Sequence, residues 1–170
     1  PGMGTPSSPY LDLAKQVRDL ALAPDLEDKA RVNLLTLLAD IGGANDLKLV
    51  LDRGAQNPAL LNELAAQARI RNRKPVGDLA KPNAALLDSD RGDVREAGLR
   101  LAGAWQVTGL SERVRKLALN KNEAAPLRAA AIESMGLLEG EKANGSLRQI
   151  ASPTESRLVQ IAAIRALTRN

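Results

Sequence analysis

Three carboxylates, Asp88, Asp90 and Asp93, lie close enough along the chain to suggest acid–base chemistry or a calcium-binding loop. A calcium loop of the EF-hand type needs a glutamate that closes it, and the required position holds none. Aspartates also favour turns and helix starts, where their side chains accept hydrogen bonds from backbone N–H groups. We therefore assign these carboxylates to a turn and predict that Asp93 is the N-cap of the helix that follows.

The segment from Gly140 to Ser146 has the glycine spacing of a phosphate-binding loop. However, Ser146 stands where the lysine of that loop belongs, Asn144 is foreign to the pattern, and no predicted strand precedes the segment. Asn144-Gly145-Ser146 also forms an N-glycosylation sequence, which matters only in a protein secreted from a cell that glycosylates. We interpret the segment as a connector between helices.

Cysteine and histidine are both absent from the 170 residues. Their absence excludes disulfides, thiolate nucleophiles and thiolate metal sites, and it removes the commonest general base near neutral pH. We therefore predict that the protein is not an enzyme and needs no metal or other cofactor.

The charge pattern argues weakly for an anionic partner. The net charge is +4, with −2 over residues 1–70 and +6 over residues 71–170, and Arg69, Arg71, Arg73 and Lys74 form the densest basic cluster. Single-stranded nucleic acid normally stacks on aromatic side chains, and the chain has one tryptophan and one tyrosine. Trp105 falls in an apolar helical pattern, so we place it in the core and expect nucleic acid not to be the partner.

The apolar residues recur at spacings of three and four, the period of amphipathic helices. Aromatic residues make up only 1% of the chain and no apolar run is long enough to span a membrane.

Residues 1–9 read as a linker or cloning remnant, and residues 10–170 as one helical domain cut from a larger protein. We expect ten helices in five hairpins, at 11–21, 26–41, 45–54, 58–70, 83–87, 93–105, 111–118, 126–138, 141–151 and 152–168.

One helical sequence pattern recurs about every thirty residues, most clearly at 93–103, 126–136 and 156–165. Looser copies allow aligned starts at 31, 60, 95, 128 and 157, with steps of 29, 35, 33 and 29 residues. Steps of this size are typical of stacked helix pairs, each of which buries its apolar face against its neighbours.

Residues 86–90 followed by 94–103 closely resemble the HEAT repeat, with a leucine-rich first helix, an aspartate-containing turn and a Val-Arg start to the second helix. Residues 117–136 and 150–167 match it less closely. The resemblance implies an all-α fold, a right-handed α-α superhelix or solenoid of about five HEAT-like hairpins. The family often pairs its turn aspartate with the arginine of the next layer. Here Arg95, Arg128 and Arg157 keep that arginine, and we expect them to be structural, but the aspartate is clear only at Asp88 or Asp90.

The repeat alignment predicts which side chains are buried between layers. The apolar residues at equivalent positions are Leu35, Leu64, Leu99, Ile132 and Ile161, and, three positions further on, Leu38, Ala102, Met135 and Ile164. Small residues that allow close helix approach are Ala39, Ala68, Gly103 and Gly136. Arg165 breaks this rule, which indicates an open end or a shifted alignment in the last repeat.

A solenoid of this kind implies a non-catalytic interaction or scaffold module, whose second helices line a concave face that binds a protein partner. From helical phase, the expected contacts are Asp40, Gln67, Arg71, Arg100, Glu133 and Arg165. The alternatives are a structural spacer between flanking domains of the parent chain and a HEAT-like nucleic-acid-binding module. Because residues 158–164 are apolar on more than one face, we expect the last helix to be covered by further residues, a neighbouring domain or end-to-end self-association.

Overall fold

The structure is a computed structural model that describes residues 9–169. Within that range the regular structure is helical and contains no strand, which confirms the all-α prediction. The predicted linker at 1–9 lies outside the described residues except for Pro9, the first residue of α1. The α-helices are α1 (Pro9–Ala21), α2 (Asp28–Ile41), α3 (Ala44–Gly54), α4 (Pro58–Arg71), α5 (Ala80–Leu87), α6 (Gly92–Ala104), α7 (Ser111–Leu119), α8 (Ala125–Glu139), α9 (Asn144–Ile150) and α10 (Arg157–Leu167), with 3-10 turns η1 (Thr108–Leu110) and η2 (Gly140–Ala143).

Local sequence signals account for several of these boundaries. Pro58 and Pro126 stand in the first turns of α4 and α8, where the missing N–H of proline has no intrahelical partner to lose. The Asn57 side chain caps α4 by accepting hydrogen bonds from the N–H groups of residues 59 and 60. Ser156 caps α10 in the same way, accepting from the N–H of Val159.

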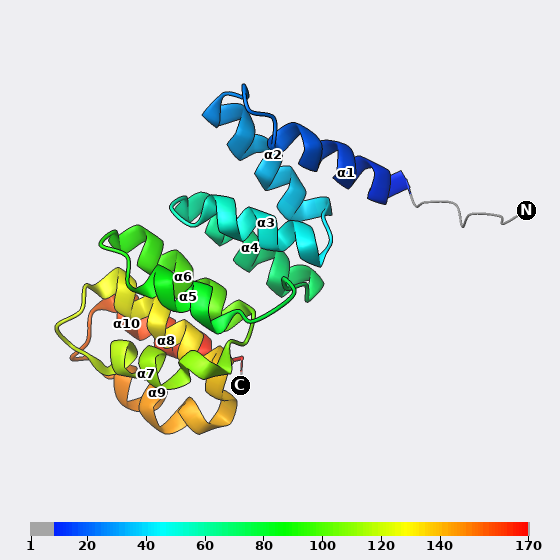
Figure 1. Ribbon diagram of the computed structural model, residues 1–170. Helices are drawn as coiled ribbons and strands as arrows, with labels where there is room; N and C mark the ends of the chain where they lie inside the picture. Colours follow the sequence, from blue (N-terminus) through cyan, green and yellow to red (C-terminus); the bar gives the residue numbers. More distant parts are fainter. Residues whose placement is uncertain (1–8, 170) are drawn as a thin grey trace, which may run out of the picture.

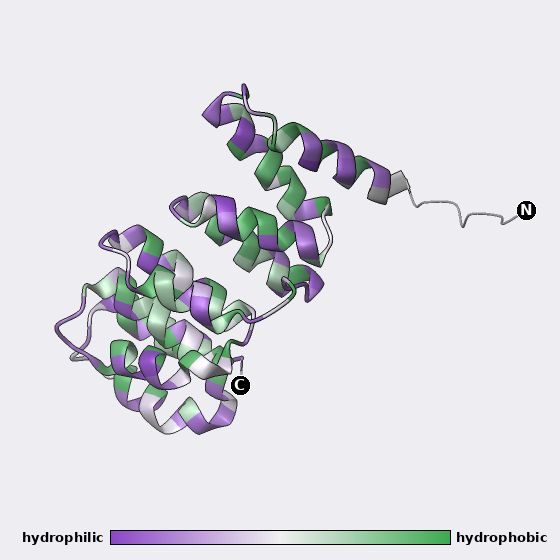
Figure 2. Cartoon of the chain, in the orientation of Figure 1, coloured by the Kyte–Doolittle hydropathy of each residue, from purple (hydrophilic) through white to green (hydrophobic). Residues whose placement is uncertain are grey.

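The even-numbered helices form a continuous row through the molecule. Each of α2, α4, α6 and α8 contacts the next even-numbered helix, and each odd-numbered helix packs against the even-numbered helix that follows it (Figure 1). Apolar residues concentrate where these helices face one another, whereas the turns of α1 alternate between hydrophilic and hydrophobic (Figure 2). No helix within residues 9–169 is long and apolar enough to cross a membrane.

Two glycines allow close approach between neighbours in the row. A Cβ atom added at Gly103 of α6 would lie 2.9 Å from the hydroxyl oxygen of Ser134, and one added at Gly136 would lie 2.9 Å from the Cβ of Ala166. Side chains at these positions would force the helices apart. The predicted role of Gly103 and Gly136 as close-packing positions is thereby confirmed.

The register of the repeat is defined by the fourth residue of each even-numbered helix, and in helix order these residues are Arg31, Leu61, Arg95, Arg128 and Gln160. The steps between them are 30, 34, 33 and 32 residues, more even than the alignment from sequence. Gln160 donates to the carbonyls of Ser152 and Glu155, as Arg31 donates to the carbonyls of Ala21 and Ala23. The start assigned to the last repeat at Arg157 was therefore wrong by three residues.

This shift corrects the burial predicted for the last repeat. Leu35, Leu99 and Ile132 are each at most 3% exposed, as predicted, but Ile161 and Ile164 are 36% and 51% exposed. The buried residues of α10 are instead Val159, Ala162, Ala163 and Ala166. Ile164 lies on a side of α10 against which no further helix of the described chain packs. In the last repeat, the position equivalent to Gly103 and Gly136 is held by Thr168 and not by Arg165. Arg165 is therefore no exception to the rule that small residues hold this position.

Three further local predictions need revision. Helix α6 begins at Gly92 with Arg91 as its N-cap, so Asp93 lies inside the first turn and does not cap it. Ser111 is the first residue of α7 and makes no capping side-chain bond, because the 3-10 turn η1 leads directly into the helix. The predicted helix 152–168 starts only at Arg157, because Pro153 lies in a turn.

Candidate protein-binding groove

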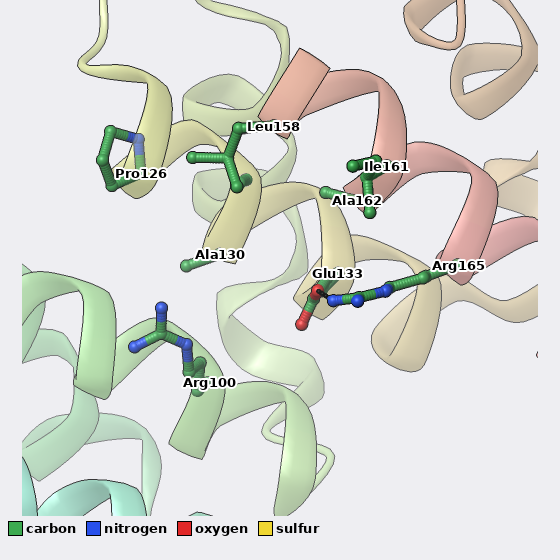
Figure 3. Close-up of a pocket in the computed structure, with 9 residues that line it drawn as sticks. Arg100, Pro126, Ala130, Glu133, Leu158, Ile161, Ala162 and Arg165 are labelled. Carbon is green, nitrogen blue, oxygen red and sulfur yellow. Dashed lines mark ion pairs between the residues drawn. The ribbon is translucent and has the colours of Figure 1, made fainter. Parts of the chain in front are cut away.

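A groove lies where α6, α8 and α10 run side by side, and it brings together Arg100, Glu133 and Arg165 (Figure 3). These three residues hold the ninth place of their respective helices, so the repeat itself presents them on one face. The groove has a volume of about 290 Å³. Half of the residues predicted as partner contacts are therefore neighbours in the structure.

The lining of the groove is mostly apolar. Ala129, Ala130 and Ala162 are buried and form its alanine-rich floor. Pro126, Leu158 and Ile161 complete the apolar lining, and Leu158 and Ile161 are 47% and 36% exposed. An apolar hollow with a few polar groups at its margin is the usual form of a site that takes a side chain of a ligand or partner.

The charged side chains that line this groove are Arg100, Arg165 and Glu133. The Arg165 guanidinium lies 4.0 Å from the Glu133 carboxylate, and the Arg100 guanidinium lies 3.3 Å from both Glu96 and the side-chain oxygen of Asn62. Figure 3 shows Arg165 extending toward Glu133, with Arg100 on the opposite side of the hollow. The Arg165 guanidinium is too far from Glu133 for a hydrogen bond, which leaves its donors available to an acidic ligand.

Arg69 of α4 extends this cationic region. Desolvation lowers the pKa of the Arg69 guanidinium, repulsion by Arg169 and Arg100 lowers the pKa further, and Glu133 partly offsets both. Mutual repulsion of this kind is relieved when an anion enters. Arg69, Arg100 and Arg169 therefore lie close enough to repel one another.

The other three predicted contacts lie on α2 and α4, outside the groove. Arg71 forms an ion pair with the Asp40 carboxylate at 2.6 Å and donates to the Asp40 carbonyl at 2.6 Å. Gln67 donates to Glu63 at 2.8 Å. These bonds tie α4 to α2 and to itself, so the structure gives Asp40, Gln67 and Arg71 intramolecular roles.

The basic cluster of the connector after α4 is partly used in the same way. Arg73 donates to the carbonyls of Gly42 and Asp40 at the end of α2, at 2.5 and 3.3 Å. Cationic side chains stabilise the carbonyl groups left free at a helix C-terminus. Trp105 is 4% exposed, so the predicted core position is confirmed and its ring is not available for stacking on a base.

The candidate acid–base groups make structural bonds instead. The Asp88 carboxylate accepts a hydrogen bond from Arg113 and the Asp93 carboxylate accepts one from Arg91, and each bond lowers the pKa of its carboxyl. Among the residues that the structure describes, no three His, Cys, Asp or Glu side chains lie together as a metal site. The segment 140–146 forms η2 and the start of α9, with the Ser146 hydroxyl accepting from Arg115.

Sequence reasoning missed the apolar half of the groove. It assigned Ile161 to a buried layer, and it expected the apolar face that contains Leu158 to be covered by further residues, a neighbouring domain or self-association. The repeat pattern could have indicated this apolar lining, because Pro126 and Leu158 are both the second residue of their helices. The three-residue error in the alignment of the last repeat hid that equivalence.

Comparisons with models of known families, with curated proteins and with solved structures found no match to this chain.

Proposed function

We propose that the protein is a non-catalytic interaction module, an α-solenoid of five HEAT-like hairpins that binds a short segment of a partner protein. The segment lies along the face made by the even-numbered helices and inserts an aliphatic side chain into the groove between α6, α8 and α10. The observation that carries this proposal is the alanine-rich hollow bordered by Arg100 and Arg165.

The geometry of the row supports an extended occupant. The ninth residues of successive even-numbered helices lie on one face, so a bound segment meets α6, α8 and α10 in turn. The aliphatic floor offers apolar burial to a leucine or isoleucine of the partner, worth about 1.5–3 kcal/mol when the side chain is fully buried. Arg100, Arg165 and Arg69 offer donors to carboxylates on either side of it, so the partner segment is acidic and aliphatic.

A binding assay with a defined probe tests this proposal. The probe is a fluorescently labelled peptide of about ten residues with alternating aspartate and leucine, and the control replaces each aspartate by lysine. We expect saturable binding of the aspartate peptide and at least tenfold weaker binding of the lysine peptide.

Variants locate the binding. Leu158→Asp places a carboxylate at the groove and Arg165→Glu reverses a charge beside it, and each should weaken binding at least tenfold without altering the helical circular-dichroism spectrum. Arg148→Glu changes an exposed arginine of α9 outside the groove and serves as the matched control. Equal losses in all three variants would assign the binding to net charge alone and contradict the proposal.

The alternatives predict different results in the same assay. A spacer between flanking domains needs no groove ligand, so absence of peptide binding at millimolar concentration would favour it. A nucleic-acid-binding module would retain a labelled oligonucleotide at about 50 mM salt and release it steeply as salt rises.

A further inference from the structure

The two ends of the row of even-numbered helices present the two halves of a contact that occurs repeatedly inside the molecule. At the α6–α8 and α8–α10 contacts, the twelfth residue of one even-numbered helix faces the tenth residue of the next. Gly136 of α8 meets Ala166 of α10 in this way, and Gly103 of α6 meets Ser134 of α8. The tenth place therefore faces the preceding helix, and the eighth and twelfth places face the following one.

In α2, the first helix of the row, the tenth residue has no preceding helix in the described chain to pack against. The tenth residues of α6, α8 and α10 are Leu101, Ser134 and Ala166, and all three are buried. Their equivalent in α2 is Leu37, which is 41% exposed because no described helix precedes α2 in the row.

In α10, the last helix of the row, the side that would face a following helix is uncovered in the described chain. The eighth residues of α2, α4, α6 and α8 are buried, each at most 3% exposed, whereas the eighth residue of α10, Ile164, is 51% exposed. Ile161, one turn earlier and 36% exposed, belongs to the lining of the groove, so the uncovered face is marked by Ile164.

The charges of the two end layers are opposite. Residues 9–41, which contain α1 and α2, hold four basic and six acidic residues, a net charge of −2. Residues 140–169, which contain η2, α9 and α10, hold five basic and two acidic residues, a net charge of +3. Two copies brought together end to end thus attract each other, whereas two identical ends repel.

We propose that a second copy of this chain covers the open face of α10, docking head to tail so that its Leu37 lies against the face that carries Ile164 and Thr168. The contact repeats the geometry of the internal layers and is heterologous, because different faces of the two copies meet. Each copy keeps one free face of each kind, so association continues into chains of copies.

The residues at the joint make this association weak and reversible. Thr168 and Leu37 stand in the places that Gly136 and Ala166 hold in the α8–α10 contact, so the two helices remain further apart than they do inside the molecule. Fewer atoms then come into van der Waals contact, and the joint opens more readily than an internal layer.

Sedimentation velocity of the full chain between about 10 µM and 1 mM tests the proposal, because end-to-end association of this strength depends on concentration. We expect the average sedimentation coefficient to rise with concentration, and to rise less at high salt because the attraction between the end layers is screened. Ile164→Glu and Leu37→Glu each remove one of the two faces and should each leave a monomer over the whole range.

Mixing the two variants gives the decisive measurement. Leu37→Glu retains the α10 face and Ile164→Glu retains the α2 face, so an equimolar mixture should restore one joint and give dimers but no longer species. Ile70→Glu, at a residue that is 74% exposed on α4, is the matched control and should associate like the unmodified chain.

Three results would overturn the proposal. They are a monomer at 1 mM, an effect of Ile164→Glu with none of Leu37→Glu (a symmetric α10–α10 contact), and an equal loss with Ile70→Glu (nonspecific association). Circular dichroism of each variant checks that the helices remain folded. Because Ile164 and Leu37 lie outside the groove, these outcomes are independent of peptide binding.

Discussion

Arg128 and Glu155 form a bidentate ion pair in which the two terminal guanidinium nitrogens lie 2.5 and 2.9 Å from the two carboxylate oxygens. Arg128 is only 5% exposed, and its Nε atom also donates to the Ala118 carbonyl at 2.9 Å. One side chain of α8 therefore holds both the end of α7 and the turn before α10. Arg95 and Glu123 repeat the relationship one layer earlier, with a longer distance of 3.6 Å.

Replacing Arg128 by alanine should lower the free energy of unfolding by roughly 2–4 kcal/mol, because the Ala118 carbonyl and the Glu155 carboxylate both lose a buried charged donor. Arg128→Lys should lose less, since an ammonium keeps the charge but cannot bridge both acceptors. Chemical denaturation measures both losses. The matched control is Arg113→Ala, whose partner Asp88 has a 68% exposed side chain, so the loss should be clearly smaller. Equal losses for the two alanine variants would contradict the role of Arg128.

The same pair should make stability depend on pH. Hydrogen bonds from Arg128 lower the pKa of the Glu155 carboxyl below its ordinary value of 4.5, and they outweigh the desolvation that acts in the opposite direction. A carboxyl with a lowered pKa in the folded state contributes stability above its ordinary pKa, and this contribution is lost as the pH falls through the folded pKa.

Comparison with Glu155→Gln isolates this contribution. The unmodified protein should be more stable than the variant near pH 6, and the difference should shrink as the pH falls below about 4.5. The lowered pKa values of Asp88 and Asp93 occur in both proteins and cancel. Urea denaturation at a series of pH values gives the difference directly, and a difference that is constant down to pH 3 would rule out the linkage.

Leu99 and Ile164 hold the same place in α6 and α10 but differ in burial, at 0% and 51% exposed. Leu99→Ala should cost roughly 2–5 kcal/mol, because it removes buried methyl groups and leaves a cavity between layers. Ile164→Ala should cost less than about 1 kcal/mol at dilute protein concentration, because little area is lost. Thermal or chemical unfolding of the two variants under identical conditions tests the contrast, and equal costs would contradict the assigned ends of the row.

The sequence predicted the helical content, most helix positions and the interior leucines well. Helical periodicity, proline at helix starts and the spacing of small residues are local signals, and they persist in the fold at Leu99, Gly103 and Gly136. The third and fourth repeats, where the pattern is strongest, have the predicted register. In the last repeat, Arg157 resembles the repeat arginine but Gln160 makes the corresponding bonds, and only three-dimensional contacts distinguish them.

The groove was only half predictable for a related reason. Helical phase indicates which side of a helix a residue faces, and this placed Arg100, Glu133 and Arg165 together. It does not indicate which polar residues bond to each other, so Asp40 and Arg71 were assigned to a partner although they pair across α2 and α4. The pairing of Arg128 with Glu155 was likewise missed, because the family pattern directed attention to an aspartate in the turn.

The effect of Gly136→Ala on the free energy of unfolding should change sign when Ala166 is also replaced, because the two residues are in contact. Gly136→Ala adds a methyl group 2.9 Å from the Ala166 Cβ, and this overpacking costs about 1–3 kcal/mol, more than the gain of roughly 1 kcal/mol in helix propensity. In the Ala166→Gly background the clash is absent, so the same Gly136→Ala substitution should stabilise the protein. Denaturant unfolding of the four proteins gives a coupling energy, and we expect at least about 1 kcal/mol because the two sites are in contact. Additive effects would mean that α8 and α10 do not approach each other closely at these residues. That result would contradict the close packing of the last two layers.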